Sequence, residues 1–163
     1  MYQPIFHYYP LDYYSYSTRY PFPFPYPTHY YSYLGIFEQE MINRINQERQ
    51  RYGRNLLSID TRLTQVARLK AKDMATLGNC EHYSPTFNGK EIKMLQDRNI
   101  PVGAGYGANV SCRRGSAMEV VNAWMASTRG HREVILNPRS NRIGGGVAVS
   151  RDGKLYWSAI FNS

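Results

Sequence analysis

The chain has 163 residues, a formal net charge of +8 and 42% hydrophobic residues, which is enough for one domain with a buried core. It contains no apolar run long enough to cross a bilayer, which excludes a membrane-spanning helix. The basic residues are scattered, with Arg113-Arg114 as the longest run, and no base-reading motif is present, so nucleic acid is not an expected partner.

The first 33 residues differ in composition from the remainder, residues 34 to 163. They hold 11 of the 15 tyrosines and 6 of the 9 prolines, but only one basic and one acidic residue. Alternating Phe and Pro in residues 21 to 27 fix φ and remove N–H donors, which predicts an extended, polyproline-like arm. Disordered linkers are usually poor in aromatic residues, so we expect these rings to dock on a neighbouring subunit. The expected docking residues are Tyr20, Phe22, Phe24, Tyr26, Tyr30 and Tyr31.

Two long helices are predicted at the start of the folded part. Apolar residues at helical spacing indicate a helix over residues 34 to 52, and Gly53 offers a left-handed cap at its end. Asp60 is a good N-cap for a second helix, which is expected to stop before Gly78. Its predicted buried stripe consists of Leu63, Val66, Ala67, Met74 and Leu77.

Short helices and a small sheet are predicted for the rest of the chain. Helical segments are expected over residues 90 to 98 and 116 to 127, and after Gly130. Asp152-Gly153 is a strong turn signal between two alternating segments, which predicts an antiparallel hairpin. The predicted strands cover residues 105 to 112, 142 to 150 and 154 to 161, and the glycines 144 to 146 indicate close backbone packing or a bulge. The expected fold is α+β, an αβα sandwich with a small antiparallel sheet between helices.

Two motifs place a histidine at the edge of a helical segment. They are Cys80-Glu81-His82-Tyr83-Ser84-Pro85 and WMASTRGHREVILNP, which spans residues 124 to 138 and contains His131; Gly107-Ala108-Asn109-Val110 lies between them. Together they resemble the bacterial branch of the CAP superfamily (cysteine-rich secretory, antigen 5 and pathogenesis-related 1 proteins). The usual pattern of that branch reads H-x-S-P, G-E-N-I and W-x-x-S-x-G-H-R-x-x-I-L-N-P. The resemblance extends over residues 36 to 162 and implies the same αβα sandwich.

The resemblance implies that His82 and His131 converge in one cleft, where neutral imidazoles can ligate zinc or another divalent ion. Where the family carries an acidic residue, this chain has Ala108. Two histidines without a carboxylate bind a metal weakly, so no resident cofactor is expected, and weak zinc binding stays open. Glu81 and Glu119 are the remaining carboxylate candidates.

A catalytic role is open but not favoured. Ser84 with either histidine would make a nucleophile and a base, yet the Ser-Pro step is more simply a turn, and no nucleophile elbow surrounds it. Asn109 completes the candidate cleft, and a cysteine with a histidine is an alternative dyad. The loss of the acidic residue at Ala108 favours a domain without catalytic activity and leaves an enzyme as an open alternative.

Cys80 and Cys112 admit three interpretations, namely free thiols, an internal disulfide or crosslinks between subunits. A reducing compartment of synthesis makes free thiols the default during folding. If the family topology holds, the two cysteines are near enough to pair once the protein enters an oxidising layer. Closing this loop would stabilise the domain by about 3 to 4 kcal/mol.

Domains that resemble this one occur in bacteria as secreted or spore-coat-associated proteins. Met1 is followed by neither a basic segment nor an apolar stretch, so we expect synthesis in the cytoplasm without a signal peptide and deposition in a spore coat or other cell-surface layer. The leading hypothesis is a structural or assembly protein of a spore surface layer or appendage, which forms a homo-oligomer or polymer through the arm. Coat proteins or a cell-wall polymer are further candidate partners. The alternatives are a metal-dependent or histidine-based hydrolase of a cell-wall or coat polymer, and a binding module for a lipid or small apolar ligand.

Overall fold

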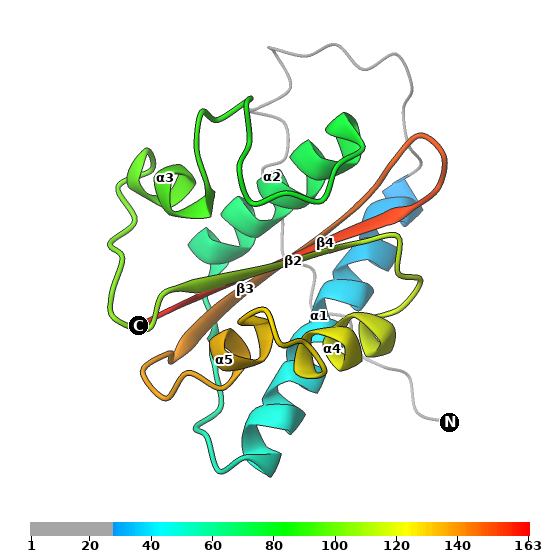
Figure 1. Cartoon of the computed structure of the whole chain (residues 1–163). Coiled ribbons are helices and arrows are strands. Elements are labelled where there is room, and N and C mark those ends of the chain that lie inside the picture. The colour runs from blue at the N-terminus through cyan, green and yellow to red at the C-terminus, as the bar shows by residue number, and fades with distance from the viewer. Residues whose placement is uncertain (1–27) are drawn as a thin grey trace.

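The computed structural model describes the backbone of residues 28 to 163 and the side chains from residue 34 onward. A thin sheet lies between helices, and α2 and α3 occupy one side of it in Figure 1. Within the described residues the elements follow in the order α1 (Thr28–Arg51), β1 (Ser58–Ile59), α2 (Thr61–Leu77), α3 (Glu91–Gln96), β2 (Gly107–Cys112), α4 (Ala117–Met125), α5 (His131–Ile135), β3 (Arg142–Val149) and β4 (Leu155–Asn162).

The sheet has the strand order β1-β3-β4-β2. β3 and β4 form the predicted hairpin with Arg142 opposite Asn162 and Val149 opposite Leu155, and β2 pairs antiparallel with β4 as an edge strand. The three predicted strands form the expected small antiparallel sheet, and a short fourth strand that was not predicted, β1, runs parallel to β3 at one edge. A strand of two residues is too short to show an alternating pattern in the sequence.

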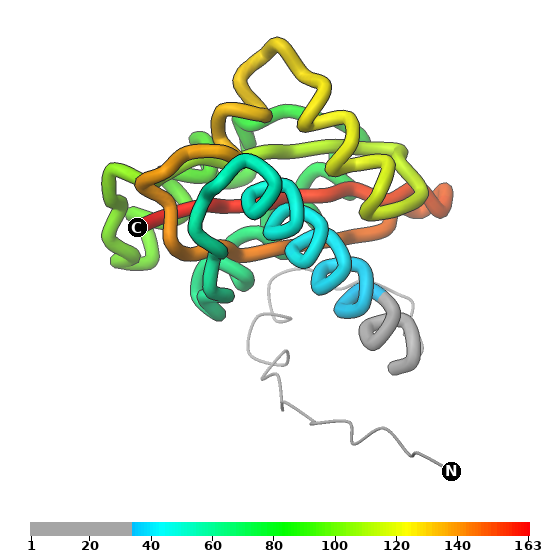
Figure 2. Tube along the Cα trace, turned by 90° about the horizontal axis from the view of Figure 1, so that it is seen from below, coloured from blue at the N-terminus to red at the C-terminus, as the bar shows by residue number. Residues whose placement is uncertain are grey.

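Successive residues of β3 face two different helices. Cβ atoms built at Gly144 and Gly146 would lie 2.1 and 2.2 Å from backbone carbon atoms of α2, whereas a Cβ at Gly145 would lie 3.0 Å from Met41 of α1. α1 and α2 therefore cover opposite faces of the sheet, and α1 crosses in front of the strands in Figure 2. The pairing of β3 with β4 is unbroken through these glycines, so they serve close packing and not a bulge.

The local signals for helix and turn boundaries are confirmed. The Asp60 side chain accepts the N–H groups of the first turn of α2, and Gly78 ends that helix with φ of 69°. Gly53 after α1 and Gly153 in the hairpin turn also have positive φ. Leu77 is the exception in the predicted stripe, since it is 43% exposed in the last turn of α2.

The first helix begins earlier than predicted. The extended arm was expected to reach residue 33, but α1 begins at Thr28. Pro27 is the last proline before this helix, and no later residue up to position 51 lacks an N–H group, so nothing in the chain prevents helix from Thr28 onward. Tyr30 and Tyr31 are therefore helical. The other expected docking residues, Tyr20, Phe22, Phe24 and Tyr26, lie outside the described residues.

A buried arginine fastens α1 to the segment that carries α5. The guanidinium of Arg49 is fully buried and donates to the carbonyl oxygens of Ile135 at 2.7 Å, Asn137 at 3.0 Å and Ser140 at 3.0 Å. It also donates to Asn55 O at 2.7 Å. Five fixed N–H donors suit an arginine to such a ring of carbonyl groups. This contact fixes the C-terminal end of α5, and His131, a candidate site residue, is the first residue of the same helix.

Candidate functional site

His82 lies in the loop between α2 and α3 and is held at two points. Its Nδ1 atom is 2.9 Å from Oε1 of Glu91, the first residue of α3, and its backbone oxygen accepts a hydrogen bond from Lys70 Nζ at 2.9 Å. The Glu91 side chain is 1% exposed, whereas that of His82 is 37% exposed. A buried carboxylate that accepts from Nδ1 leaves Nε2 as the nitrogen able to accept a proton or bind a ligand.

Lys70 is the buried cation beneath this loop. Burial lowers its pKa, and the negative charges of Glu91, Asp73 and Glu81 oppose that shift. Its Nζ atom lies 3.9 Å from Asp73 Oδ2, which is buried and has no hydrogen-bond partner among the described residues. The positive charge of Lys70 thus balances the buried carboxylates and holds the loop that carries His82.

His131 is the first residue of α5, and Gly130 precedes it with φ of 93°. Its Nδ1 atom is 2.9 Å from Ser127 Oγ, which also accepts the Arg129 N–H at 3.0 Å. Because the hydroxyl oxygen already accepts that N–H, its own hydrogen is available for Nδ1. Burial lowers the pKa of His131, and the charges of His82 and Arg129 lower it further, so the neutral imidazole is favoured.

His82 comes from the loop after α2, and His131 comes from the start of α5, which contacts the edge strand β2. The charge of His82 acts on His131, so the imidazoles lie within electrostatic reach of one another. Asn109 of β2 is fully buried, and its Nδ2 atom donates to His131 O at 3.0 Å. Its Oδ1 atom has no partner among the described residues. Asn109 therefore joins α5 to the sheet and leaves one polar oxygen unpaired next to His131.

The carboxylate that contacts a site histidine is one that sequence reasoning missed. Glu81 is exposed, and Glu119 accepts the Gly115 N–H at 2.9 Å as part of the cap of α4, so neither candidate contacts a histidine among the described residues. Glu91 takes that role. An acidic residue in a first helical turn is common for helix stability alone, so the sequence carried no signal that would single it out. Ala108 faces the same side of β2 as Val110, which packs against α2.

The donor set does not amount to a tight zinc site. Among the described residues, no group of three or more His, Cys, Asp or Glu side chains is placed to hold a metal ion. His82 and His131 supply two imidazoles, and Glu91 contacts His82 on Nδ1 and so acts as its outer partner. Tight zinc sites supply three or four protein ligands.

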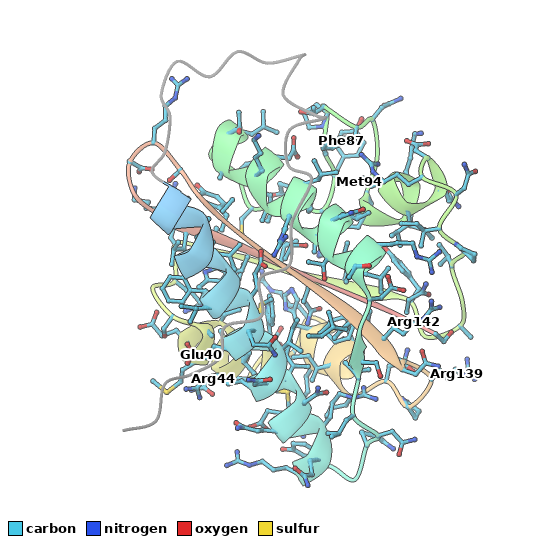
Figure 3. The ribbon with its side chains drawn as sticks, turned by 180° about the vertical axis from the view of Figure 1, so that it is seen from behind. Glu40, Arg44, Phe87, Met94, Arg139 and Arg142 are labelled. Atoms are coloured by element: carbon cyan, nitrogen blue, oxygen red, sulfur yellow. The ribbon has the colours of Figure 1, made fainter. Side chains whose placement is uncertain are left out.

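Ser84 belongs to a turn. It is fully buried, forms an isolated bridge with Gly89, and its Oγ atom accepts the Phe87 N–H at 3.2 Å. Within the described part of the chain, its hydrogen bonds link it to neither histidine. Phe87 from this turn packs against the cluster that contains Met94 of α3, and both residues are labelled in Figure 3. The geometry supports the turn interpretation over that of a nucleophile.

Cys80 and Cys112 are both free and half-buried. Burial raises the pKa of Cys80 to about 12, and the neighbouring Cys112 thiol adds to this effect. A thiol that holds its proton in this way is a weak nucleophile. A dyad between Cys80 and a histidine gains no support from this environment.

A shallow surface pocket of about 370 Å³ lies beside α5 but contains neither histidine. Its lining includes three charged side chains, which does not fit a site for a lipid or small apolar ligand. The lining residues are Arg54, Arg132, Glu133, Leu136, Asn137 and Pro138. None of the helices described from residue 28 on has the length and apolar character of a membrane span.

Two comparisons, one with family models and one with individual protein sequences, find relatives of this chain. Residues 42–161 match the model of CAP, the cysteine-rich secretory protein family. The protein YkwD of Bacillus subtilis (strain 168) is 36% identical over 119 residues, which are 73% of this chain and 45% of YkwD. The chain therefore spans less than half the length of this relative.

Two solved structures have a similar fold. One is an extracellular protein containing a SCP domain from Bacillus anthracis str. Ames, with a TM-score of 0.73, 24% identity and coverage of 85% of this chain and 44% of that one. The other is an outer surface protein from Borrelia burgdorferi, with a TM-score of 0.63, 21% identity and coverage of 77% and 93%. The three motifs, the αβα sandwich and the family match agree, and the chain belongs to CAP, the cysteine-rich secretory protein family.

Proposed function

We propose that this protein is a structural or assembly protein of a bacterial surface layer, such as a spore coat or a spore appendage. In this proposal the CAP domain is the rigid body, and the N-terminal arm docks on a neighbouring copy. The observation that carries it is the contrast in composition, since residues 1 to 33 are aromatic and nearly uncharged while the domain holds all of the net charge of +8. Aromatic rings bury a large area at low entropic cost, which suits them to a docking segment.

The connection between arm and domain supports this role. α1 begins at Thr28, within the last six residues of the arm, and its residues Met41, Ile42 and Ile45 are buried in the core shared with α4 and the sheet. Arg49 fastens the far end of the same helix to the α5 segment. A load applied to the arm is therefore carried into the core of the domain.

Two structural neighbours support a surface location for this protein. One structural neighbour is extracellular and another is an outer surface protein, and both likenesses are likenesses of fold. We propose coat proteins and cell-wall polymers as further partners of the assembled layer. The basic domain favours acidic partners, because its 19 basic residues exceed its 11 acidic residues.

The test replaces four expected docking residues, Tyr20, Phe22, Phe24 and Tyr26, by Ser in the full chain. A matched control replaces Tyr8, Tyr9, Tyr13 and Tyr14, which leaves the Phe-Pro run intact. Sedimentation velocity and electron microscopy then compare the three proteins over a range of concentrations. We expect the docking variant to be monomeric and the control to assemble as the unchanged chain does. Equal assembly of all three proteins would refute the proposal.

A second candidate function is a histidine-based hydrolase of a cell-wall or coat polymer. The specific observation in its favour is the buried Glu91 carboxylate on Nδ1 of His82, which orients the ring and leaves Nε2 for general base catalysis. The test measures release of soluble fragments from purified wall and coat material. Replacement of Glu91 by Gln would lower a true activity at least about tenfold, whereas Glu81→Gln, one residue from His82 and exposed, would leave it unchanged. If the unchanged protein releases nothing, this candidate fails.

A further inference from the structure

The end of α2 and the end of β2 meet at the edge of the sheet. Met74 and Ala75, near the end of α2, form one buried cluster with Val110 of β2, and Cys112 packs against that cluster. Cys80 follows the end of α2 by three residues, after the left-handed turn at Gly78. The packing of the helix on the strand therefore brings the two cysteines to one place, although 32 residues separate them in the sequence.

The two thiols are neighbours there. Cys112 packs against the cluster at the end of α2, Cys80 lies three residues beyond that end, and both cysteines are partly accessible to solvent. A disulfide forms without backbone movement only when the two cysteines are already close and face one another. The packing of α2 on β2 brings the two cysteines toward this condition, and the effect of Cys112 on the pKa of Cys80 agrees with thiols that are neighbours. Partial exposure also gives a small oxidant access to the pair.

We propose that Cys80 and Cys112 form a redox-closable pair, and that their disulfide fastens the loop that carries His82 to the edge strand β2. His82 is two residues from Cys80, and its position otherwise depends on the noncovalent contacts with Glu91 and Lys70. On the other side, β2 holds α5 through Asn109. The disulfide thus joins covalently the two segments that position the candidate site, and the reduced state leaves the His82 loop freer to move.

The oxidant in this proposal is a small disulfide such as oxidised glutathione. One cysteine thiolate attacks a sulfur of the oxidant, which forms a mixed disulfide and releases one glutathione thiolate. The second cysteine loses its proton and attacks the protein sulfur of the mixed disulfide, which forms the Cys80–Cys112 bond and releases the second glutathione. In sum, the protein loses two protons and two electrons, and the oxidant becomes two thiols. The raised pKa of Cys80 assigns the first attack to Cys112.

The test uses the full chain, reduced and then equilibrated at low protein concentration in mixtures of reduced and oxidised glutathione. Free thiols are alkylated in denaturant, and intact mass and nonreducing electrophoresis identify the products. We expect a monomer that has lost about 2 Da, binds no alkylating reagent and retains no glutathione. We also expect slower amide hydrogen exchange in residues 78 to 91 after oxidation, with no change in the β3–β4 hairpin. Chains with glutathione on both cysteines, or disulfide-linked dimers as the main product, would overturn the proposal.

A matched variant separates proximity from simple reactivity. Cys112→Ser combined with Ser111→Cys moves the thiol by one residue, to the opposite face of β2. We expect this variant to form no internal disulfide and to accumulate the glutathione adduct. Internal closure at the same rate as in the unchanged chain would show that contact across α2 and β2 does not govern the reaction. Neither experiment depends on the arm or on histidine chemistry, so the result is independent of the proposed function.

Discussion

Replacement of Arg49 by Met tests whether the buried guanidinium holds the α5 segment in place. The side chain is fully buried and makes four hydrogen bonds to backbone carbonyl groups, at 2.7 to 3.0 Å. Removal of a charged donor from buried acceptors costs about 1.5 to 3 kcal/mol for each bond in isolation, but the variant also removes the cost of burying the charge. We therefore expect a net loss of about 3 to 5 kcal/mol in the free energy of unfolding.

Urea unfolding followed by circular dichroism measures this change, with Arg44→Met as the control. Arg44 lies on the same helix and pairs with Glu40 on the outer surface, where both are labelled in Figure 3. A partly exposed pair four residues apart on a helix contributes about 0.3 to 0.5 kcal/mol. Hydrogen exchange should also show faster opening of residues 131 to 141 in the Arg49 variant. A loss below about 1 kcal/mol for Arg49→Met would refute the argument.

Three further predictions concern the sheet and the two histidines. Gly146→Ala places a Cβ 2.2 Å from the α2 backbone and should cost about 1 to 3 kcal/mol in urea unfolding, whereas Gly115→Ala, with 3.8 Å of clearance, should be nearly neutral. Because the pKa of His131 is lowered in the folded state, the unfolded chain binds more protons, and the free energy of unfolding should fall as the pH drops below about 6.5. His131→Asn should reduce this dependence of stability on pH. An unchanged dependence would contradict the assignment. Ala108→Glu should raise zinc affinity at least about tenfold in calorimetry, while Ser111→Glu, on the opposite face of β2, should not.

The helix and turn boundaries could be predicted because their causes lie within a few residues. Asp60 caps α2 through N–H groups two and three residues away, and Gly78 ends that helix by its own left-handed conformation. Gly144 and Gly146 also gave a usable signal, since glycines inside an alternating segment indicate a close backbone neighbour. The start of α1 could not be placed from the Phe-Pro run, because a proline restricts the residue before it more than the residues after it.

The candidate site was only partly predictable because its contacts join distant segments. His82 and His131 were identified from local motifs, but the carboxylate beside His82 comes from Glu91, and the choice among carboxylates depends on how α3 packs. In the sequence, nothing distinguishes Lys70 from the other residues of a long helix. Only the structure shows that Lys70 is buried and donates a hydrogen bond to the loop that carries His82. Arg49 contacts residues 86 to 91 positions away, so no local pattern could reveal it.

The central claim, that the arm docks on a neighbouring copy, is tested most directly by mixed-isotope crosslinking. Unlabelled and heavy-isotope-labelled chains are mixed, allowed to assemble and crosslinked through tyrosine, and the crosslinked peptides are identified by mass spectrometry. The account predicts crosslinks that join an arm peptide from one isotope pool to a domain peptide from the other. Crosslinks between arm and domain that occur only within a single isotope pool would contradict it.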